Sequence, residues 1–69
     1  MELLGRVADR FVISRTATYN WVKKYRDELK KEGLIEEKRK GSRIYTYVKD
    51  VDRFIEFFQK RGVYLVDED

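Results

Sequence analysis

Residues 14–48 read SRTATYNWVKKYRDELKKEGLIEEKRKGSRIYTYV, and the spacing of apolar side chains changes within this stretch. As far as Leu29 the apolar residues recur every three or four positions, which is typical of one face of a helix. From Arg43 to Val48, β-branched and aromatic residues follow in a two-residue alternation, which is typical of a strand. A helix that leads directly into strands predicts a small α+β domain.

The helix is expected to begin after Ser14, whose hydroxyl can accept a hydrogen bond from the backbone N–H of Ala17. It is expected to run without interruption to a stop at Gly33. Its apolar stripe consists of Thr18, Trp21, Val22, Tyr25 and Leu29. This stripe predicts that one side of the helix packs on the body of the protein.

The two strands are expected at residues 34–39 and 43–48, with Gly41 and Ser42 between them. Glycine at the first central position is what a two-residue type II′ hairpin turn requires. Four cationic residues surround this turn: Lys38, Arg39, Lys40 and Arg43. The sequence therefore predicts a hairpin with a strongly basic tip.

Further helices are expected on both sides of this unit. Residues 2–10 carry a helical apolar stripe, and residues 51–61 carry another, between a capping residue Asp50 and a stop at Gly62. Residues 63–66 form a short apolar run, either a strand or an extended segment packed on the body. The expected order is helix, helix, β-hairpin, helix, in one domain of residues 1–69.

Composition excludes several kinds of chemistry. The chain of 69 residues has no cysteine and no histidine, so disulfides, Cys/His zinc sites and histidine acid–base catalysis are ruled out. The acidic pairs Asp27-Glu28 and Glu36-Glu37 are adjacent rather than opposed, and no glycine-rich phosphate loop is present. We therefore expect no enzymatic activity, cofactor, metal or small-molecule ligand.

Charge is distributed unevenly along the chain. The net charge is +3, and residues 1–50 hold the whole basic surplus, with 13 Lys and Arg against 8 Asp and Glu. Such asymmetry fits a basic nucleic-acid face and a separate body. No apolar run approaches the roughly 18 residues of a membrane span, and no signal peptide pattern is seen. A cytoplasmic, nucleoid-associated protein is expected.

The polar side of the second helix is the first candidate DNA-binding surface. Its residues are Arg15, Thr16, Tyr19, Asn20, Lys23, Lys24 and Arg26. Asparagine suits bidentate contact with adenine, whereas arginine and lysine suit guanine or phosphate. An ordinary solvated helix surface is the alternative for this set, and Trp21 is interpreted as a core residue rather than a base-stacking platform.

The hairpin tip is the second candidate surface. Its residues are Lys38, Arg39, Lys40, Ser42 and Arg43. A narrow basic hairpin can follow phosphates or place an arginine in the minor groove. The alternative is a solubilising strand edge, because lysine often protects such edges.

The segment Val7–Val22 resembles the helix-turn-helix of MerR-like and excisionase-like regulators, through Ala8, Ser14-Arg15-Thr16, Tyr19 and Trp21-Val22. Residues 31–36 and 41–45 are similar to the end of a recognition helix and the wing of winged-helix regulators. Residues 51–55 resemble the helix that follows the wing, so the resemblance covers about residues 3–60. Two positions depart from it: Val12 stands where glycine is usual, and Thr18 where an aliphatic residue is usual.

The resemblance implies a winged helix-turn-helix, with the helix-turn-helix at about residues 2–32, the wing at 34–48, and the C-terminal helix and tail after it. It also implies sequence-specific binding of double-stranded DNA in transcription control, recombination or replicon maintenance. A winged-helix module that binds protein rather than DNA is the alternative function. RNA binding is less favoured, because no single-strand recognition module is apparent.

A homodimer is expected, because a core of this size is marginal and the C-terminal region has surplus apolar residues. Phe57 falls outside the apolar stripe of its helix, and an apolar run follows. The expected dimer interface consists of Phe57, Tyr64, Leu65 and Val66. The alternative is that these residues fold back over the hairpin of the same chain.

Overall fold

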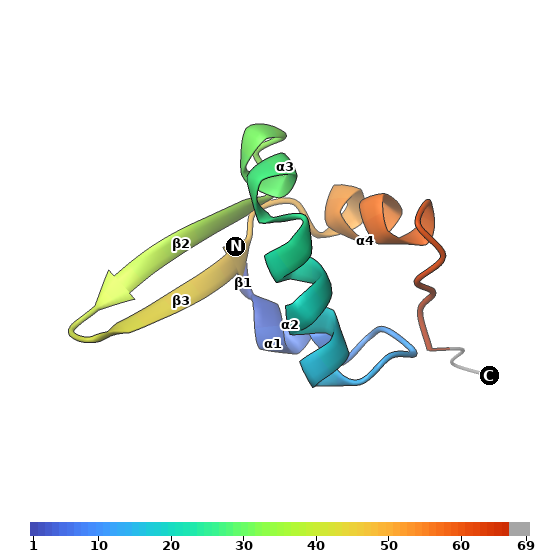
Figure 1. Cartoon of the computed structure of the whole chain (residues 1–69), viewed down its shortest axis with the longest axis horizontal. Helices are drawn as coiled ribbons and strands as arrows, with labels where there is room; N and C mark the ends of the chain where they lie inside the picture. The colour runs from blue at the N-terminus through green and yellow to red at the C-terminus, as the bar shows by residue number, and fades with distance from the viewer. Residues whose placement is uncertain (67–69) are drawn as a thin grey trace.

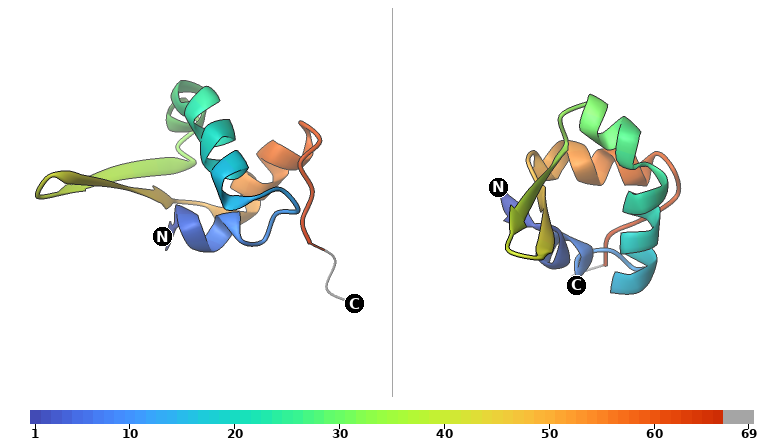
Figure 2. Two further views of the ribbon diagram at one scale, coloured as in Figure 1. Left: turned by 60° about the horizontal axis from the view of Figure 1, so that its bottom comes forward. Right: turned by 60° about the vertical axis from the view of Figure 1, so that its left-hand side comes forward.

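The computed structural model describes residues 1–66 as a small α+β domain in which a long hairpin projects away from a group of helices (Figures 1 and 2). The elements are β1 (Glu2–Leu3), α1 (Leu4–Ala8), α2 (Arg15–Lys24), α3 (Arg26–Lys31), β2 (Ile35–Lys40), β3 (Arg43–Val48) and α4 (Val51–Gln59). The expected α+β class is confirmed, as is the hairpin between the central and C-terminal helices.

The three strands form one antiparallel sheet in the order β1-β3-β2. In the hairpin, Ile35 pairs with Val48 and Lys40 pairs with Arg43, which leaves Gly41 and Ser42 as a two-residue turn. Gly41 has a φ of 60°, and no non-glycine residue in the described chain has a positive φ. A type I′ turn would need positive φ at Ser42 as well, so the signs of φ exclude type I′ and match the predicted type II′ turn.

The first helix is shorter than predicted. Residues 2–10 were expected to be helical, but α1 covers only Leu4–Ala8, and Glu2 and Leu3 form strand β1. These two residues pair with Val48 and Tyr47 of β3. A tertiary backbone pairing therefore overrides the helical apolar pattern at this end, and Leu3 remains 39% exposed.

The second helix is interrupted, which the sequence did not indicate. Tyr25, with φ −104° and ψ 18°, separates α2 from α3. The Tyr25 N–H still donates to the carbonyl of Trp21, and its own carbonyl accepts from Leu29 N–H, so the chain bends without opening into a loop. The Tyr25 ring packs against Trp21 and Phe57, at centroid distances of 5.6 and 5.8 Å. Tertiary packing of this ring accompanies the bend.

The helix ends otherwise follow the predicted signals. Ser14 Oγ accepts from Ala17 N–H at 3.0 Å, and Asp50 Oδ1 accepts from Arg53 N–H at 3.2 Å. After α3, Gly33 adopts a φ of 70°, and Leu34 N–H donates to the carbonyl of Leu29. This is a Schellman termination, whose left-handed position favours glycine. α4 ends at Gln59 rather than at the expected residue 61.

The core is rich in aromatic rings and lies among the helices. Phe54 and Phe58 of α4 are almost fully buried, and their centroids lie 4.9 Å apart. Phe11 approaches both rings, and the partly buried Trp21 packs edge-on against Phe58. Trp21 therefore contributes to the core, as predicted.

The C-terminal segment packs on the body rather than on the hairpin. Val12 N–H donates to the Tyr64 carbonyl and Val66 N–H donates to the Arg10 carbonyl, each at 2.8 Å, around an antiparallel bridge between Phe11 and Leu65. Val63 is buried in the core. The expectation of an extended segment is confirmed, and its partner is the connector after α1.

None of the helices described between residues 1 and 66 combines the length and apolar composition needed to cross a bilayer.

Candidate nucleic-acid interface

Helix α2 presents a polar face with no acidic residue. Its side toward the body buries Thr18 and Val22, and the Thr18 hydroxyl donates to the Ser14 carbonyl at 3.0 Å. That hydrogen bond lets threonine occupy a buried position where an aliphatic residue was expected from the resemblance. The exposed residues are Arg15, Thr16, Tyr19, Asn20, Lys23 and Lys24.

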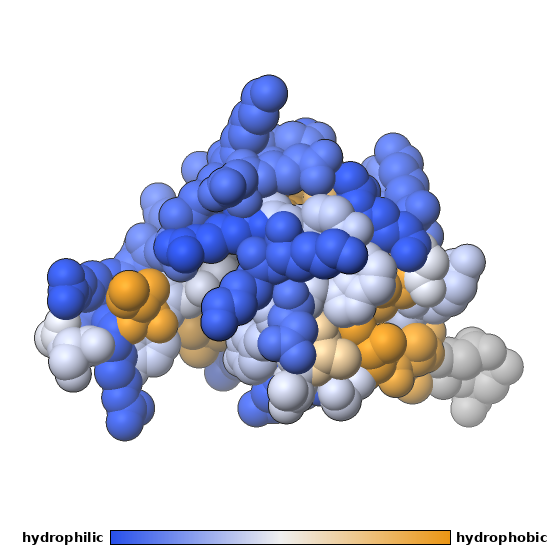
Figure 3. All heavy atoms as spheres, in the orientation of Figure 1, coloured by the Kyte–Doolittle hydropathy of each residue, from blue (hydrophilic) through white to orange (hydrophobic). Residues whose placement is uncertain are grey.

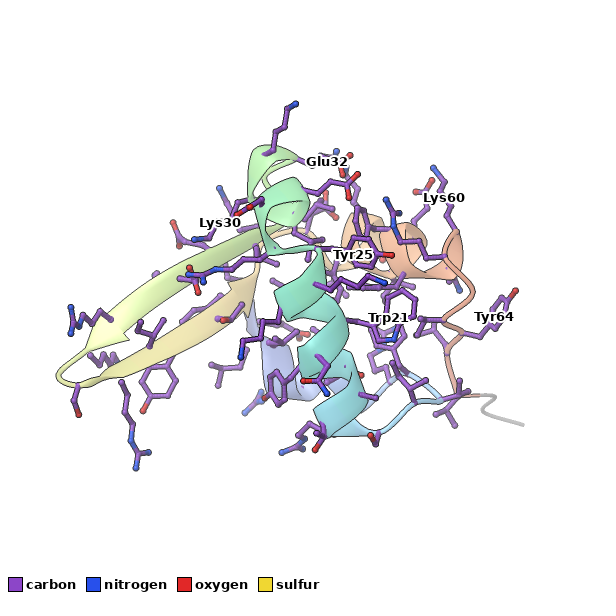
Figure 4. All side chains as sticks on the ribbon, in the orientation of Figure 1. Trp21, Tyr25, Lys30, Glu32, Lys60 and Tyr64 are labelled. Atoms are coloured by element: carbon purple, nitrogen blue, oxygen red, sulfur yellow. The ribbon has the colours of Figure 1, made fainter. Side chains whose placement is uncertain are left out.

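The structure joins part of this face to the hairpin. A groove of about 290 Å³ runs between α2 and the sheet, with Tyr19, Asn20 and Lys23 on one wall and Glu37 and Thr46 on the other. Figure 4 shows side chains from α2 and from the hairpin converging in the angle between them. The exposed face of α2 therefore adjoins the base of the hairpin, through Glu37 and Thr46 rather than through the predicted residues of the tip.

Tyr19 lies where α1, α2 and β3 meet. It lines a second groove, of about 320 Å³, together with Leu3, Gly5, Ile44 and Thr46. A Cβ atom placed on Gly5 would lie 3.1 Å from the Tyr19 hydroxyl oxygen. The absence of a side chain at Gly5 thus allows the Tyr19 ring to pack close to α1 while the residue stays 42% exposed.

Arg15 is oriented by a carboxylate from the preceding turn. Its Nε and Nη2 groups donate to Asp9, with the shortest distance 2.7 Å, and both side chains are more than half exposed. Hydrogen bonding and the charge of Asp9 raise the pKa of Arg15 above its ordinary value. The pair with Asp9 therefore orients the Arg15 guanidinium at the start of α2.

Arg26 is held at the sheet rather than presented freely. Both Arg26 and Lys30 form ion pairs with Glu37 of β2. Hydrogen bonds from Lys30 and then Arg26 lower the pKa of Glu37. This cluster ties α3 to the base of the hairpin, and it offsets the charge that Arg26 would offer to phosphate.

Lys24 lies apart from the other predicted residues. Its Nζ sits 5.7 Å from the Trp21 ring centroid and 5.5 Å from that of Tyr25. Figure 4 shows Trp21 and Tyr25 on the side of α2 that faces α4, away from the hairpin. The structure therefore does not bring Lys24 into the surface formed by α2 and the hairpin.

The basic residues of the hairpin are divided between its two faces. Arg39 is opposite Ile44, on the face that continues inward to Thr46 and Val48, whereas Lys38 is opposite Tyr45 on the other face. Lys38 Nζ lies 3.9 Å from Glu36 and 5.4 Å from the Tyr47 ring centroid. Lys40, Ser42 and Arg43 surround the exposed tip.

Five predicted residues carry charge without an ion-pair partner among residues 1–66. They are Lys23 and Lys24 on α2 and Arg39, Lys40 and Arg43 on the hairpin, and of these Lys24 lies over the Trp21 and Tyr25 rings. Figure 3 shows hydrophilic side chains covering much of the hairpin and the adjoining helices on the visible face.

Ile44 is a surface residue that the sequence interpretation did not single out. It is 61% exposed, although Val48 on the same face of β3 is fully buried. The signal was its position beside the turn, at the end of the strand that is far from the core. The alternating pattern predicts which face of the strand a residue lies on, but not how far along the strand that face is covered by the helices.

The predicted dimer residues separate into two groups. Phe57 was expected outside the core, and this is wrong: its side chain is 6% exposed, packs against Tyr25 and Phe58, and has the Arg61 guanidinium 3.6 Å from its centroid. Leu65 packs partly against the core. Tyr64 and Val66 are 60% and 50% exposed, and Figure 4 shows Tyr64 pointing away from the body.

A larger groove, of about 690 Å³, lies between α3 and α4. Its walls carry both signs of charge, including Glu28, Lys31, Arg53 and Lys60. Within residues 1–66, no three Asp or Glu side chains come together as metal ligands would.

Comparisons with protein-family models, with curated proteins and with solved structures found no match to this chain.

Proposed function

We propose that this protein is a winged helix-turn-helix that binds double-stranded DNA, with α2 in the major groove and the hairpin as the wing. The observation that carries the proposal is the shared groove between the exposed face of α2 and the hairpin. Tyr19, Asn20 and Lys23 line it on the helix side. A helix of this kind needs one apolar side for support and one polar side with reach toward base edges.

The dimensions of the hairpin support this mode of binding. Six residues per strand correspond to about 20 Å at about 3.4 Å per residue. Half a turn of B-DNA is about 17 Å, which is the spacing between a major groove and the next minor groove. The basic tip would then lie on the minor groove or its phosphates while α2 occupies the major groove.

Roles within the surface follow from the contacts of each residue. Asn20, exposed beside the groove, is the proposed base reader, because its amide can pair with adenine. Arg15, oriented by Asp9, is proposed to contact guanine or phosphate. Lys23, Arg39, Lys40 and Arg43 are proposed to contact phosphates, since no ion pair occupies them within residues 1–66. Transcription control, recombination and replicon maintenance all use such binding.

The test is a titration of the protein with random-sequence duplex DNA at several salt concentrations, followed by selection of preferred sites from random duplexes. Four phosphate contacts predict that log K falls with log salt at a slope of about −3.6. Selection should yield a defined site, and an inverted repeat would indicate a bound dimer. Absence of duplex binding at low salt would contradict the proposal.

Protein recognition is the second candidate function, favoured by the groove between α3 and α4. Arg53 and Lys31 line it without an ion-pair partner among residues 1–66, and Leu34 and Phe57 contribute apolar surface. The groove lies on helices that take no part in the proposed DNA surface. Reversal of charge at Arg53 should leave duplex affinity nearly unchanged if the two surfaces are independent.

A further inference from the structure

The hairpin carries a large apolar side chain in a position where water surrounds it. Ile44 is 61% exposed, and no other large apolar residue of the described hairpin is exposed to this degree. Figure 3 shows an apolar patch among hydrophilic side chains on the hairpin. Packing within the domain covers it only in part, along the groove that it lines with Leu3 and Tyr19.

The end of the hairpin that carries Ile44 is cationic. Arg39 pairs directly with Ile44 and shares its face, whereas Arg43 and its partner Lys40 lie next to this pair on the opposite face. Three positive charges at this end of the hairpin disfavour contact with a second copy of the same hairpin, because like charges repel. Together with Ile44, they favour a binding partner that is a polyanion with an apolar interior.

Ile44 also faces the side on which α2 lies. It shares its face of β3 with Thr46, which lines the groove beside Asn20 and Lys23, and it shares the second groove with Tyr19. A duplex seated on α2 would therefore meet this face of the hairpin near its tip.

We propose that Ile44 is a wedge that enters the minor groove and partly unstacks a base step, so that the protein bends the DNA it binds. This inference rests on the proposed function. Proteins that kink DNA insert an apolar side chain between base pairs while adjacent cations hold the phosphates. Arg39, on the same face as Ile44, would supply one of those cations, and Arg43 would reach a phosphate from the opposite face of the hairpin. The bend would bring phosphates toward the hairpin, and flexible pyrimidine–purine steps would be preferred at this position.

The experiment uses the full chain and an end-labelled duplex of about 30 bp that contains the selected site and a T·A step at the distance of the wing. Energy transfer between the ends reports bending, and 2-aminopurine at the step reports unstacking. Wild type should bend the duplex by roughly 20° or more and raise the 2-aminopurine fluorescence. Ile44→Ala should abolish both signals and change affinity by less than about tenfold.

Two control variants separate the wedge from its alternatives. Ile44→Leu should restore bending, and Tyr45→Ala, on the opposite face of the same strand, should leave it unchanged. A straight duplex in the wild-type complex, or full bending by Ile44→Ala, overturns the inference while the proposed function stands. If Ile44→Ala changes the number of protein chains bound per duplex while the duplex stays bent, the inference is also overturned. Absence of any duplex binding overturns the proposed function and this inference together.

Discussion

The Arg15 guanidinium donates to both carboxylate oxygens of Asp9, through contacts of 2.9 and 2.7 Å. The pair spans the connector between α1 and α2, and it orients the first side chain of α2. Because both groups are largely exposed, the pair contributes little to folding. Its effect is expected in recognition instead.

We expect Asp9→Ala to leave the midpoint of thermal unfolding nearly unchanged and to weaken discrimination between the selected site and random duplex. Arg15 would keep its charge but lose its fixed orientation, and removal of a carboxylate would raise affinity for random DNA. Competition binding with both duplexes measures the ratio. Arg15→Ala should lower affinity for both, and an unchanged ratio in Asp9→Ala would show that Asp9 does not position Arg15.

The adjacent lysines of α2 offer a matched comparison. Lys23 lines the groove beside the hairpin, whereas Lys24 lies over Trp21 and Tyr25. Lys23→Ala should reduce the slope of log K against log salt by about one unit. Lys24→Ala should leave the slope unchanged although it removes the same charge. Equal effects of the two variants would indicate unspecific attraction rather than a defined surface.

Asn20 is expected to carry base specificity. Asn20→Ala should cost about 1–3 kcal/mol of binding free energy at the selected site and little on random duplex. Site selection repeated with the variant should show lost preference at one or two positions. Full affinity and unchanged preference would exclude Asn20 as a reader.

Glu37 should make stability depend on pH. Its pKa is lowered in the folded state from an ordinary 4.5, so its stabilising effect is present above that value and disappears as the pH falls through the lowered pKa. At neutral pH, Glu37→Gln should lower the free energy of unfolding by about 0.5–1 kcal/mol. Well below pH 4.5 the variant and wild type should converge.

Glu36→Gln is the matched control for that measurement, because Glu36 is on the opposite face of β2 and has a single cation at 3.9 Å. Its substitution should have a smaller effect at neutral pH. Denaturant unfolding at several pH values gives both comparisons. A Glu37→Gln difference that persists in acid would mean that packing, not charge, is responsible.

A homodimer remains a prediction, and it now depends on Tyr64 and Val66. Phe57→Ala should destabilise the fold by about 3–5 kcal/mol, because this ring is buried in the core. Tyr64→Ala should change stability by less than about 0.5 kcal/mol and should shift any dimer toward monomer. Light scattering at micromolar concentration, with and without the selected duplex, measures the stoichiometry. Wild type that is monomeric in both conditions would contradict the dimer.

Local signals in the sequence were sufficient for much of this fold. The caps at Ser14 and Asp50, the stop at Gly33 and the turn at Gly41 each depend on backbone groups within a few residues. A short segment of sequence is therefore enough to predict them. The same holds for strand β3 and its alternating faces. The residues of the α2 and hairpin surfaces could be predicted for the same reason, since the spacing of apolar residues and the charge of each side chain are both read from a short segment.

Tertiary structure alone decided the remainder, because it depends on contacts between distant segments. Glu2 and Leu3 became a strand only because β3 offered a free edge, and the bend at Tyr25 accompanies ring packing against α4. Phe57 was buried by Tyr25 and Arg61, neither of which its helical stripe could indicate. Arg15 pairs with Asp9, Lys24 lies outside the groove, and Ile44 remains largely exposed near the end of the hairpin. A periodic pattern shows which residues share a face, and only the packed chain determines what that face meets.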